Sequence, residues 1–215
     1  MQKRRCRVVA FIDAQNVRGD FRRAFFPEDA PPSAGWFHPM ALGNLFASRG
    51  PDFEDWTLSG VRIYAGSPVA TRDSYAAAAH DRQVEAWRSE GAEPRLRPLL
   101  YPSAWPAEKP RQKGVDVELA VDVVRMAIAG EYEIGVIAST DQDLLPAIET
   151  LVALRGAEAT PRICVVRYGS LPKRLNYTDK QGRTLHAFHL TEADYEGVRD
   201  DTDYTAPAPR SPDPD

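Results

Sequence analysis

Cysteine is scarce in this 215-residue chain, and a long apolar run is missing altogether. The two cysteines, Cys6 and Cys164, lie beside or within apolar, β-branched runs, so we expect buried thiols in a reducing compartment rather than a disulfide framework. No stretch is long and apolar enough to span a membrane. The basic start, MQKRRC, precedes an apolar run that is short and ends at Asp13, which is not the pattern of a signal peptide. We therefore expect a cytoplasmic protein with no membrane association.

An excess of positive charge is also absent. The formal net charge is −4 and the pI is about 5.6, so the composition does not mark the whole chain as a nucleic-acid binder, and any basic surface must be local. The four histidines, at positions 38, 80, 186 and 189, do not form a zinc-like spacing with the cysteines. A metal site built only from oxygen ligands fits this composition better than a zinc site.

Strand and helix patterns alternate along the chain. Apolar runs predict strands at 8–13, 61–65, 133–138 and 162–167, with a proline-weakened extended segment at 91–100 and a sixth candidate at 185–190. Helices are expected at 14–26, 39–48, 74–89, 115–129 and 144–154. This alternation is typical of a mostly parallel sheet with helices on both faces.

Two segments carry further expectations. The helix over 115–129 is apolar on almost every side, which predicts that it is well buried. From residue 199 the chain runs RDDTDYTAPAPRSPDPD, which is acidic, proline-rich and without apolar periodicity. We expect one domain over 1–198, followed by a disordered tail at 199–215.

Acidic residues gather where the predicted strands end. Asp13 closes the first apolar run, and Asp141 and Asp143 follow the run Ile134–Ala138. In open parallel sheets, ligands bind outside the carboxyl ends of the strands, so Asp13 and Asp141 meet if their strands are neighbours. Clustered carboxylates repel one another and require a cation or shifted pKa values. Hard cations such as Mg²⁺ and Mn²⁺ prefer oxygen ligands.

Each acid also has a purely structural interpretation. Asp13, Asp116 and Asp143 stand where a helix N-cap is expected. Asp122 lies in the middle of a helix, where a polar stripe shared with Glu118 and Arg125 favours a satisfied charge cluster. If Asp116 is helical, it faces about 240° away from Asp122, so the two acids do not both ligate one metal. Asn16 could aim its amide at the strand-end crevice or be solvated, and Lys113 could contact a phosphate or be a loop lysine.

Three motifs, taken together, resemble a known family. They are VVAFIDAQNV (8–17), QKGVDVELAVDVV (112–124) and VIASTDQDLLPAI (136–148). They resemble the NYN domain family, specifically its LabA-like (DUF88) branch, within the PIN-like nuclease superfamily. The resemblance runs from residue 6 to residue 168 and makes the domain over 1–198 an NYN, PIN-like domain. It implies a Rossmann-like α/β/α three-layer sandwich with a mostly parallel sheet of order 3-2-1-4-5, and a Mg²⁺- or Mn²⁺-dependent ribonuclease with endonucleolytic action.

The resemblance also implies roles for individual residues. The catalytic set would be Asp13, Asn16, Asp116, Asp141 and Asp143, with the four acids as metal ligands. Asp122 and Ser139 would not bind the metal themselves but would hold these ligands in position. Lys113, Arg72 and Arg111 would hold the phosphate backbone of the substrate, and Trp36, Trp105 and Tyr101 could stack on bases. Thr140 stands where the family commonly has glycine, and a β-branched residue there disfavours a positive φ.

Two other functions compete with a ribonuclease. A haloacid-dehalogenase-like phosphatase needs two acids in a D-x-D pattern at the first strand, whereas this chain has Asp13-Ala14-Gln15. A PIN-like domain that is catalytically weak or inactive, and instead binds RNA or protein as a regulatory module, is the alternative. RNA is the expected partner, and a homodimer or a protein partner stays open.

Overall fold

The computed structural model describes residues 3–154, 162–172, 175–178, 182 and 184–206. Its centre is a six-stranded sheet in the order β3-β2-β1-β4-β5-β6, in which every neighbouring pair of strands is parallel. The strands are β1 (Arg4–Asp13), β2 (Glu54–Ser67), β3 (Glu93–Pro98), β4 (Ile134–Ala138), β5 (Arg162–Tyr168) and β6 (His186–Leu190). The expected α/β class and strand order are confirmed, and the sixth candidate strand extends the sheet beyond β5.

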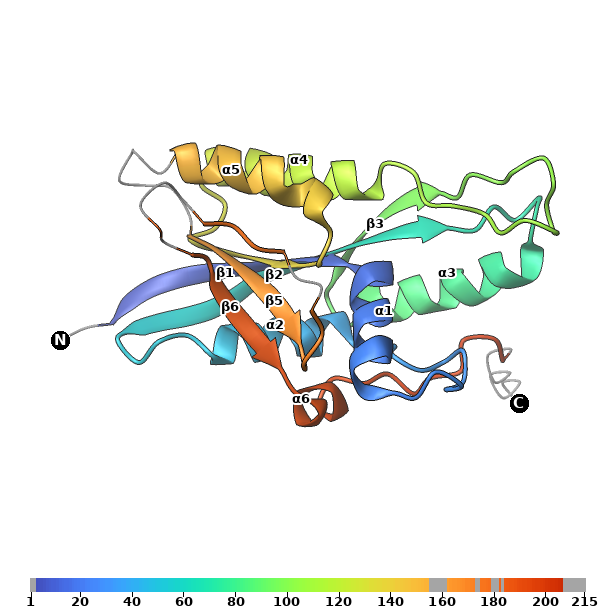
Figure 1. Ribbon diagram of the computed structural model, residues 1–215, viewed down its shortest axis with the longest axis horizontal. Coiled ribbons are helices and arrows are strands. Elements are labelled where there is room, and N and C mark those ends of the chain that lie inside the picture. The colour runs from blue at the N-terminus through green and yellow to red at the C-terminus, as the bar shows by residue number, and fades with distance from the viewer. Residues whose placement is uncertain (1–2, 155–161, 173–174, 179–181, 183, 207–215) are drawn as a thin grey trace, which may run out of the picture.

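Helices cover both faces of the sheet (Figure 1). The helices are α1 (Ala14–Phe25), α2 (Pro39–Ser48), α3 (Ser74–Ser89), α4 (Val115–Ile128), α5 (Leu145–Leu154) and α6 (Glu192–Glu196), and a 3₁₀ turn, Gln142–Leu144, precedes α5. The five helices expected from the sequence are present with ends within one residue of the predicted ones. Within the described residues, no helix is long and apolar enough to cross a membrane.

The two faces of β1 explain why its sequence is apolar without alternation. Val8, Ala10 and Ile12 pack into a core shared with α1, α2 and α3, while Val9 and Phe11 pack into a second core under α4 and α5. A strand buried on both faces reads as a continuous apolar run. Side chains alternate between the two faces of a strand, so Asp13 lies on the same face as Val9 and Phe11. β1 therefore ends with a carboxylate on the face that α4 and α5 cover.

The expectation that α4 is well buried, because it is apolar on almost every side, is wrong for its outer face. Val115, Leu119 and Val123 are buried against the sheet, but the side chains of Val121 and Ile128 are 57% and 71% exposed. One layer of helices covers each face of the sheet, so nothing in the described chain lies over the outer side of α4.

Residues 199–206 form a strap across the domain, which differs from the disordered tail expected there. The backbone of Arg199 bridges that of Phe37 in antiparallel fashion, and Asp200 is 4% exposed. The Asp200 carboxylate accepts hydrogen bonds from the Tyr204 hydroxyl at 2.8 Å and from the Thr202 N–H at 2.9 Å. Composition suggested disorder because the strap has no apolar period, but hydrogen bonds rather than apolar packing fix it in place. The rest of the expected tail, 207–215, lies outside the described residues.

Candidate functional site

The strand ends of β1 and β4 bring the first motif and the third motif together. Ile12 and Ala138 are register partners in the parallel β1–β4 pair, so Asp13 and Ser139 follow side by side at the carboxyl edge of the sheet. Asp13 caps α1, and its Oδ1 accepts a hydrogen bond from the Asn16 N–H at 3.0 Å. The capping role suggested for Asp13 is therefore real, and it fixes the largely buried carboxylate at the carboxyl edge of the sheet.

Asp13 is the most perturbed acid of this edge. It is 8% exposed. Burial raises the pKa of its carboxyl to about 6, and the negative charges of Asp141 and Asp116 push in the same direction, against a hydrogen bond from the Asn16 backbone. Asp141 and Asp116 therefore each lie within electrostatic reach of Asp13. Their joint use as metal ligands stays a prediction.

Asp141 and Asp143 do not play equivalent parts. Asp141 caps the 3₁₀ turn, and its Oδ1 accepts a hydrogen bond from the Asp143 N–H at 3.1 Å. The Asp141 N–H in turn donates to the Ser139 hydroxyl oxygen at 3.1 Å, which gives Ser139 a positioning role. The capping role that the sequence suggested for Asp143 belongs to Asp141. Asp143 is exposed in the turn and is not among the charges that dominate the pKa of Asp13, so it lies at the rim of the cluster.

Asp116 lies in the first turn of α4, two residues after Gly114. Gly114 is the N-cap and has φ of +76°, a left-handed conformation that favours glycine. This turn sets the direction in which α4 starts and hence the position of Asp116 over the strand ends. Because Asp116 is helical, the angular argument applies, and it points well away from Asp122.

Asp122 belongs to a charge cluster on β2 and β3. Its Oδ2 accepts hydrogen bonds from Arg62 at 2.9 Å and from the Tyr64 hydroxyl at 3.0 Å. Burial alone would raise the pKa of Asp122, but these hydrogen bonds and the charges of Arg62 and Arg95 hold it below its ordinary value. Tyr64 is the register partner of Asp13, so this cluster borders the site without supplying a free carboxylate.

A second network, which the sequence analysis missed, fixes α1 to the loop after β4. The Oδ1 atom of Asn16 accepts from the Thr140 N–H at 2.9 Å, and the Thr140 hydroxyl lies 2.8 Å from Asp20 Oδ2. Asp20 is fully buried and also pairs with Arg23. Asn16 and Asp20 share one face of α1, a spacing that is visible in the sequence, but that spacing does not reveal their partner in the loop after β4. With Oδ1 engaged, the Nδ2 donor is the end of Asn16 available to a ligand.

Thr140 adopts this role without backbone strain. No residue other than glycine has a positive φ in the described chain, so the turn accommodates threonine where the family commonly has glycine. Nearby, the buried Tyr168 hydroxyl has no hydrogen-bond partner among the described residues. Burial raises the pKa of Tyr168, and the charges of Asp20 and Asp13 raise it further, so Tyr168 lies behind the carboxylates as a neutral phenol.

Basic and aromatic side chains border a cavity of about 470 Å³ beside the start of α1. The lining includes Gln15, Arg18, Trp36, Arg111 and Gln112. The Arg18 guanidinium lies 4.5 Å from the centre of the Trp36 ring. Of these, Arg111 and Trp36 were expected near a substrate, whereas Arg18 and the two glutamines were not.

The remaining residues expected to bind substrate are placed less directly. Lys113 is exposed between Arg111 and Asp116, and Arg72 is exposed in the turn that follows β2. Tyr101 and Trp105 pack edge to face with ring centres 5.1 Å apart. Their rings are engaged with each other, which is the packing role rather than the stacking role.

The acids fit a hydrated divalent cation. In the described part of the chain, no group of three His, Cys, Asp or Glu side chains is arranged to hold a metal ion directly. The candidate donors are nevertheless all carboxylates. Burial is the main cause of the raised pKa of Asp13 and the charges of Asp141 and Asp116 add to it, and a bound cation would favour the ionised carboxylate. Mg²⁺ keeps several of its waters and binds through one or two carboxylates, which matches acids that approach one another without closing a cage.

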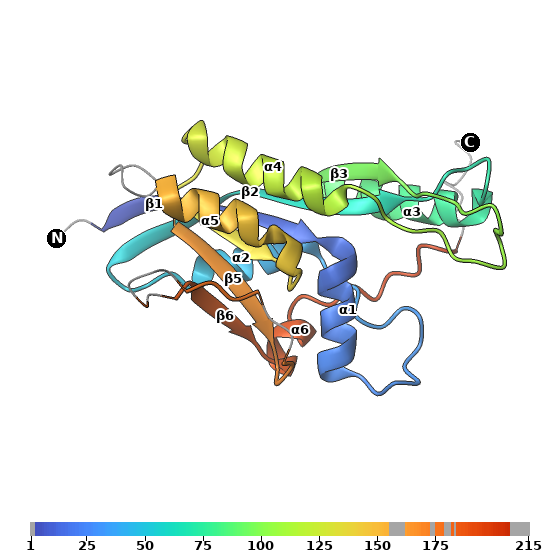
Figure 2. The same cartoon turned by 45° about the horizontal axis from the view of Figure 1, so that its top comes forward.

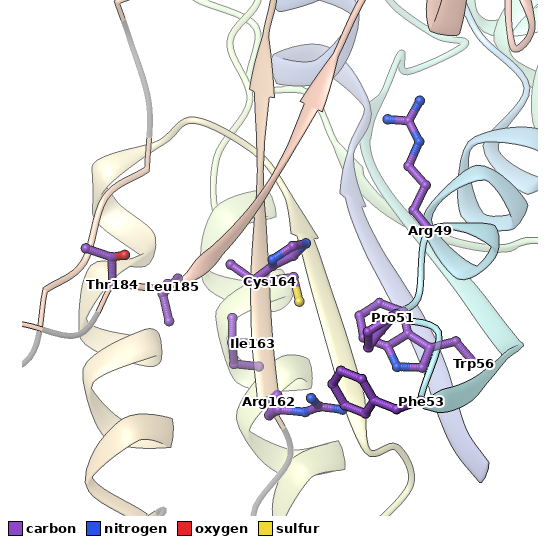
Figure 3. A pocket seen from close by; sticks show the side chains of 10 residues that line it. Arg49, Pro51, Phe53, Trp56, Arg162, Ile163, Cys164, Thr184 and Leu185 are labelled. Atoms are coloured by element: carbon purple, nitrogen blue, oxygen red, sulfur yellow. The ribbon is translucent and has the colours of Figure 1, made fainter. Parts of the chain in front are cut away.

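A second cavity, of about 460 Å³, lies at the opposite end of the strands (Figure 3). Its lining includes Arg49, Phe53, Trp56, Arg162 and His186, around the first residues of β2, β5 and β6. Arg162 is ion-paired with Glu54 and Arg49 with Asp194. This cavity is at the amino ends of the strands, away from Asp13, Asp116 and Asp141.

Comparison with known proteins agrees with this geometry. The chain matches the NYN domain family over residues 7–159. No curated protein matches it. A crystal structure of a protein of unknown function from Vibrio parahaemolyticus RIMD 2210633 is similar in fold, with a TM-score of 0.51 and 16% sequence identity over 89% of this chain and 98% of that one. The family match spans most of the chain and all three motifs, and with the parallel sheet and its strand-end acids it shows that the chain belongs to the NYN domain family of the PIN-like nuclease superfamily.

Proposed function

We propose that this chain is a Mg²⁺- or Mn²⁺-dependent endoribonuclease of the LabA-like (DUF88) branch. The observation that carries the proposal is the buried Asp13 at the carboxyl edge of the sheet, where burial first, and then the charges of Asp141 and Asp116, raise the pKa of its carboxyl to about 6. A nuclease needs an anionic site that binds a cation next to a negatively charged substrate, and this edge provides one.

The chain divides the work among these residues. Asp13, Asp116 and Asp141 would hold the cation, and Asp143 would reach it through water from the rim. When bound, such a cation lowers the pKa of a water molecule and neutralises charge on the phosphate. Asn16 would donate its Nδ2 hydrogen to a phosphate oxygen or to the attacking water. Ser139 would keep Asp141 in place. The cluster of Asp122 with Tyr64 would hold the β2 side of the site in position.

The cavity beside α1 supports single-stranded RNA as the substrate. The Arg18 guanidinium lies against the Trp36 ring, and the two groups together present the kind of planar surface on which an unpaired base stacks. Gln15 and Gln112 offer amide groups to base edges. Arg111 lines this cavity, and Lys113 stands between Arg111 and Asp116 in the sequence. Both would contact phosphates, and Arg72 would contact the backbone farther along. This basic rim is local, in accord with the net charge of −4.

Cleavage of a labelled mixed RNA pool tests the proposal, with Mn²⁺, with Mg²⁺ and with EDTA. We expect metal-dependent cleavage, and we expect Asp13→Asn and Asp141→Asn each to lower it by about 100-fold or more, because each removes a charged metal ligand. Asp52→Asn, at an exposed acid in the turn before β2, is the matched control and should cleave like the wild type. A DNA pool of the same composition reports the preference for RNA.

The alternative is a regulatory module that binds RNA or protein with little or no catalysis. The observation that favours it is the lack of a closed three-ligand arrangement in the described residues. Absence of cleavage with any metal, together with RNA binding that both asparagine variants retain, would establish this alternative in place of the nuclease.

A further inference from the structure

The outer face of α4 carries an apolar stripe of four β-branched residues, which we call the α4 stripe. The α4 stripe consists of Val117, Val121, Val124 and Ile128. Successive spacings of four, three and four residues confine these side chains to an arc of about 60°. The arc points directly away from the sheet. Three of the seven large apolar side chains exposed in the described chain, those of Val117, Val121 and Ile128, lie on it.

The folding of a single chain does not account for the α4 stripe. Valine and isoleucine are poorer helix formers than alanine, leucine or lysine because they lose side-chain freedom against the preceding turn. At the exposed positions Val117, Val121 and Ile128 they gain little burial in return. Val124 is partly buried and packs against the core under α4 and α5. A contiguous exposed apolar patch of this kind marks a surface that is covered in the working protein.

We propose that a second copy of this chain covers the α4 stripe, with the two α4 helices antiparallel across a two-fold axis. The axis would pass between Val121 and Val124. It would set Val121 against Val124 of the second copy and Val117 against Ile128 of the second copy. Each residue of the stripe therefore meets another member of the same stripe, which is the self-complementarity that a two-fold interface requires. This inference does not depend on the proposed nuclease activity.

The same two-fold axis would place opposite charges beside the α4 stripe against each other. Glu118 and Arg125 lie on one flank, seven residues apart and therefore nearly in line along the helix. The axis would bring Glu118 of each copy close to Arg125 of the other, so the contact is formed twice. Within one chain, Glu118 pairs with Arg97 at 2.6 Å and Arg125 with Glu131 at 3.2 Å. The second copy thus joins two existing ion pairs into a network. In a parallel two-fold pair the flank that carries Glu118 and Arg125 would face the opposite flank of the second helix, so these contacts would be absent.

The other flank of the stripe faces α5. A shallow, open hollow of about 560 Å³ lies between α4 and α5, and its lining consists of Ala120, Arg125, Pro146, Ala147 and Thr150 together with Val121, Val124 and Ile128 of the stripe. Figures 1 and 2 both show α4 and α5 side by side on the same face of the sheet. The two-fold axis would keep both α5 helices on this flank, so each copy would contribute two helices to the interface.

Self-association tests the interface in solution. We expect the wild-type protein to sediment at twice the 23.9 kDa of one chain. Val121→Glu should weaken the dimer by about 100-fold, because each copy then buries a charge in an apolar seam. Phe53→Glu is the matched control, since Phe53 is 73% exposed but far from α4, and it should leave the dimer intact. A monomeric wild type would overturn the proposal, as would a dimer that tolerates Val121→Glu.

Crosslinking tests the antiparallel direction. Cys6 and Cys164 are buried, so cysteines placed on the α4 stripe are the reactive thiols of the described chain. A mixture of Val117→Cys protein and Ile128→Cys protein should crosslink through a short bismaleimide. Val117→Cys protein alone should not, because its two copies would lie about 16 Å apart along the helix axis. Efficient crosslinking of Val117→Cys protein with itself would indicate parallel helices and contradict the proposed axis.

Discussion

At the scale of single residues, Asp13 couples stability to pH. Its folded-state pKa is about 6, against an ordinary value of 3.8. Between these two values the folded protein keeps the proton and the unfolded chain releases it. The stabilising contribution is therefore complete at about pH 4 and is lost as the pH rises through about 6.

Asp13→Asn should abolish this dependence in metal-free protein. Asparagine keeps a side-chain oxygen that can cap α1, but it carries no charge to bury. We expect the variant to match the wild type near pH 4 and to be more stable by up to about 3 kcal/mol at pH 7.5. Urea unfolding in EDTA at both pH values measures the difference. Parallel pH profiles for the wild type and Asp13→Asn would contradict it, and the exposed Asp143→Asn should retain the wild-type profile.

The sequence identified the acidic residues of the site more completely than the residues that form hydrogen bonds with the site. Asp13 and Asp141 were predictable because each follows an apolar run, and parallel strands end at one edge of the sheet. The link from Asn16 through Thr140 to Asp20 was not, although the helical spacing of Asn16 and Asp20 was visible. A buried acid in a helix signals nothing until the loop that hydrogen-bonds it is known. The sequence suggested Asp143 as the N-cap, but Asp141 has this role because a 3₁₀ turn precedes α5. No residue pattern predicted that turn.

At the scale of elements, the start of α4 depends on one glycine. Gly114 has φ of +76°, and a Cβ atom there would meet nothing within 4 Å, so only backbone strain opposes another residue. Gly114→Ala should cost about 1 to 2 kcal/mol. It should also lower RNA cleavage, because the turn that positions Asp116 would shift.

Gly130 provides the matched control for this prediction. It lies just beyond the other end of α4 with φ of +66° and equally open surroundings. Gly130→Ala should therefore cost a similar free energy in a urea unfolding experiment while leaving cleavage unchanged. Equal losses of cleavage in both variants would show that stability, and not the placement of Asp116, is responsible.

Most elements were predictable because apolar periodicity and helix ends are local signals. The early part of β2 was missed, although residues 54–60 alternate between partly buried and exposed side chains, which is the period-two pattern of a half-buried strand. The outer face of α4 was mispredicted for a different reason. An apolar helix surface indicates burial, but the sequence does not say whether the same chain supplies the cover.

At the scale of the whole molecule, the strap joins two distant parts of the fold. The Asp200 N–H donates to the Trp36 carbonyl oxygen at 3.1 Å, and Arg82 of α3 donates to the Tyr204 carbonyl oxygen at 2.8 Å. Ending the chain after Val198 should lower the free energy of unfolding by about 2 to 4 kcal/mol, because these hydrogen bonds and the buried Asp200 are lost.

Ending the chain after Ala206 is the control for this truncation. It retains the whole strap and should change the free energy of unfolding by less than about 0.5 kcal/mol. Thermal or urea unfolding of the two shortened proteins beside the full chain measures both effects. If the two truncations behave alike, the strap contributes nothing to stability.

The strand order also determines how the chain reaches its folded state. β1 lies in the middle of the sheet, and one of its neighbours is β4, so that Ile12 pairs with Ala138. Contacts between segments so far apart form slowly, because closing a long loop costs entropy before the contacts repay it. Until β4 docks, β1 presents an apolar edge that can pair with another chain. The yield of refolding therefore depends on a race between this intramolecular pairing and aggregation, and dilution favours the native protein.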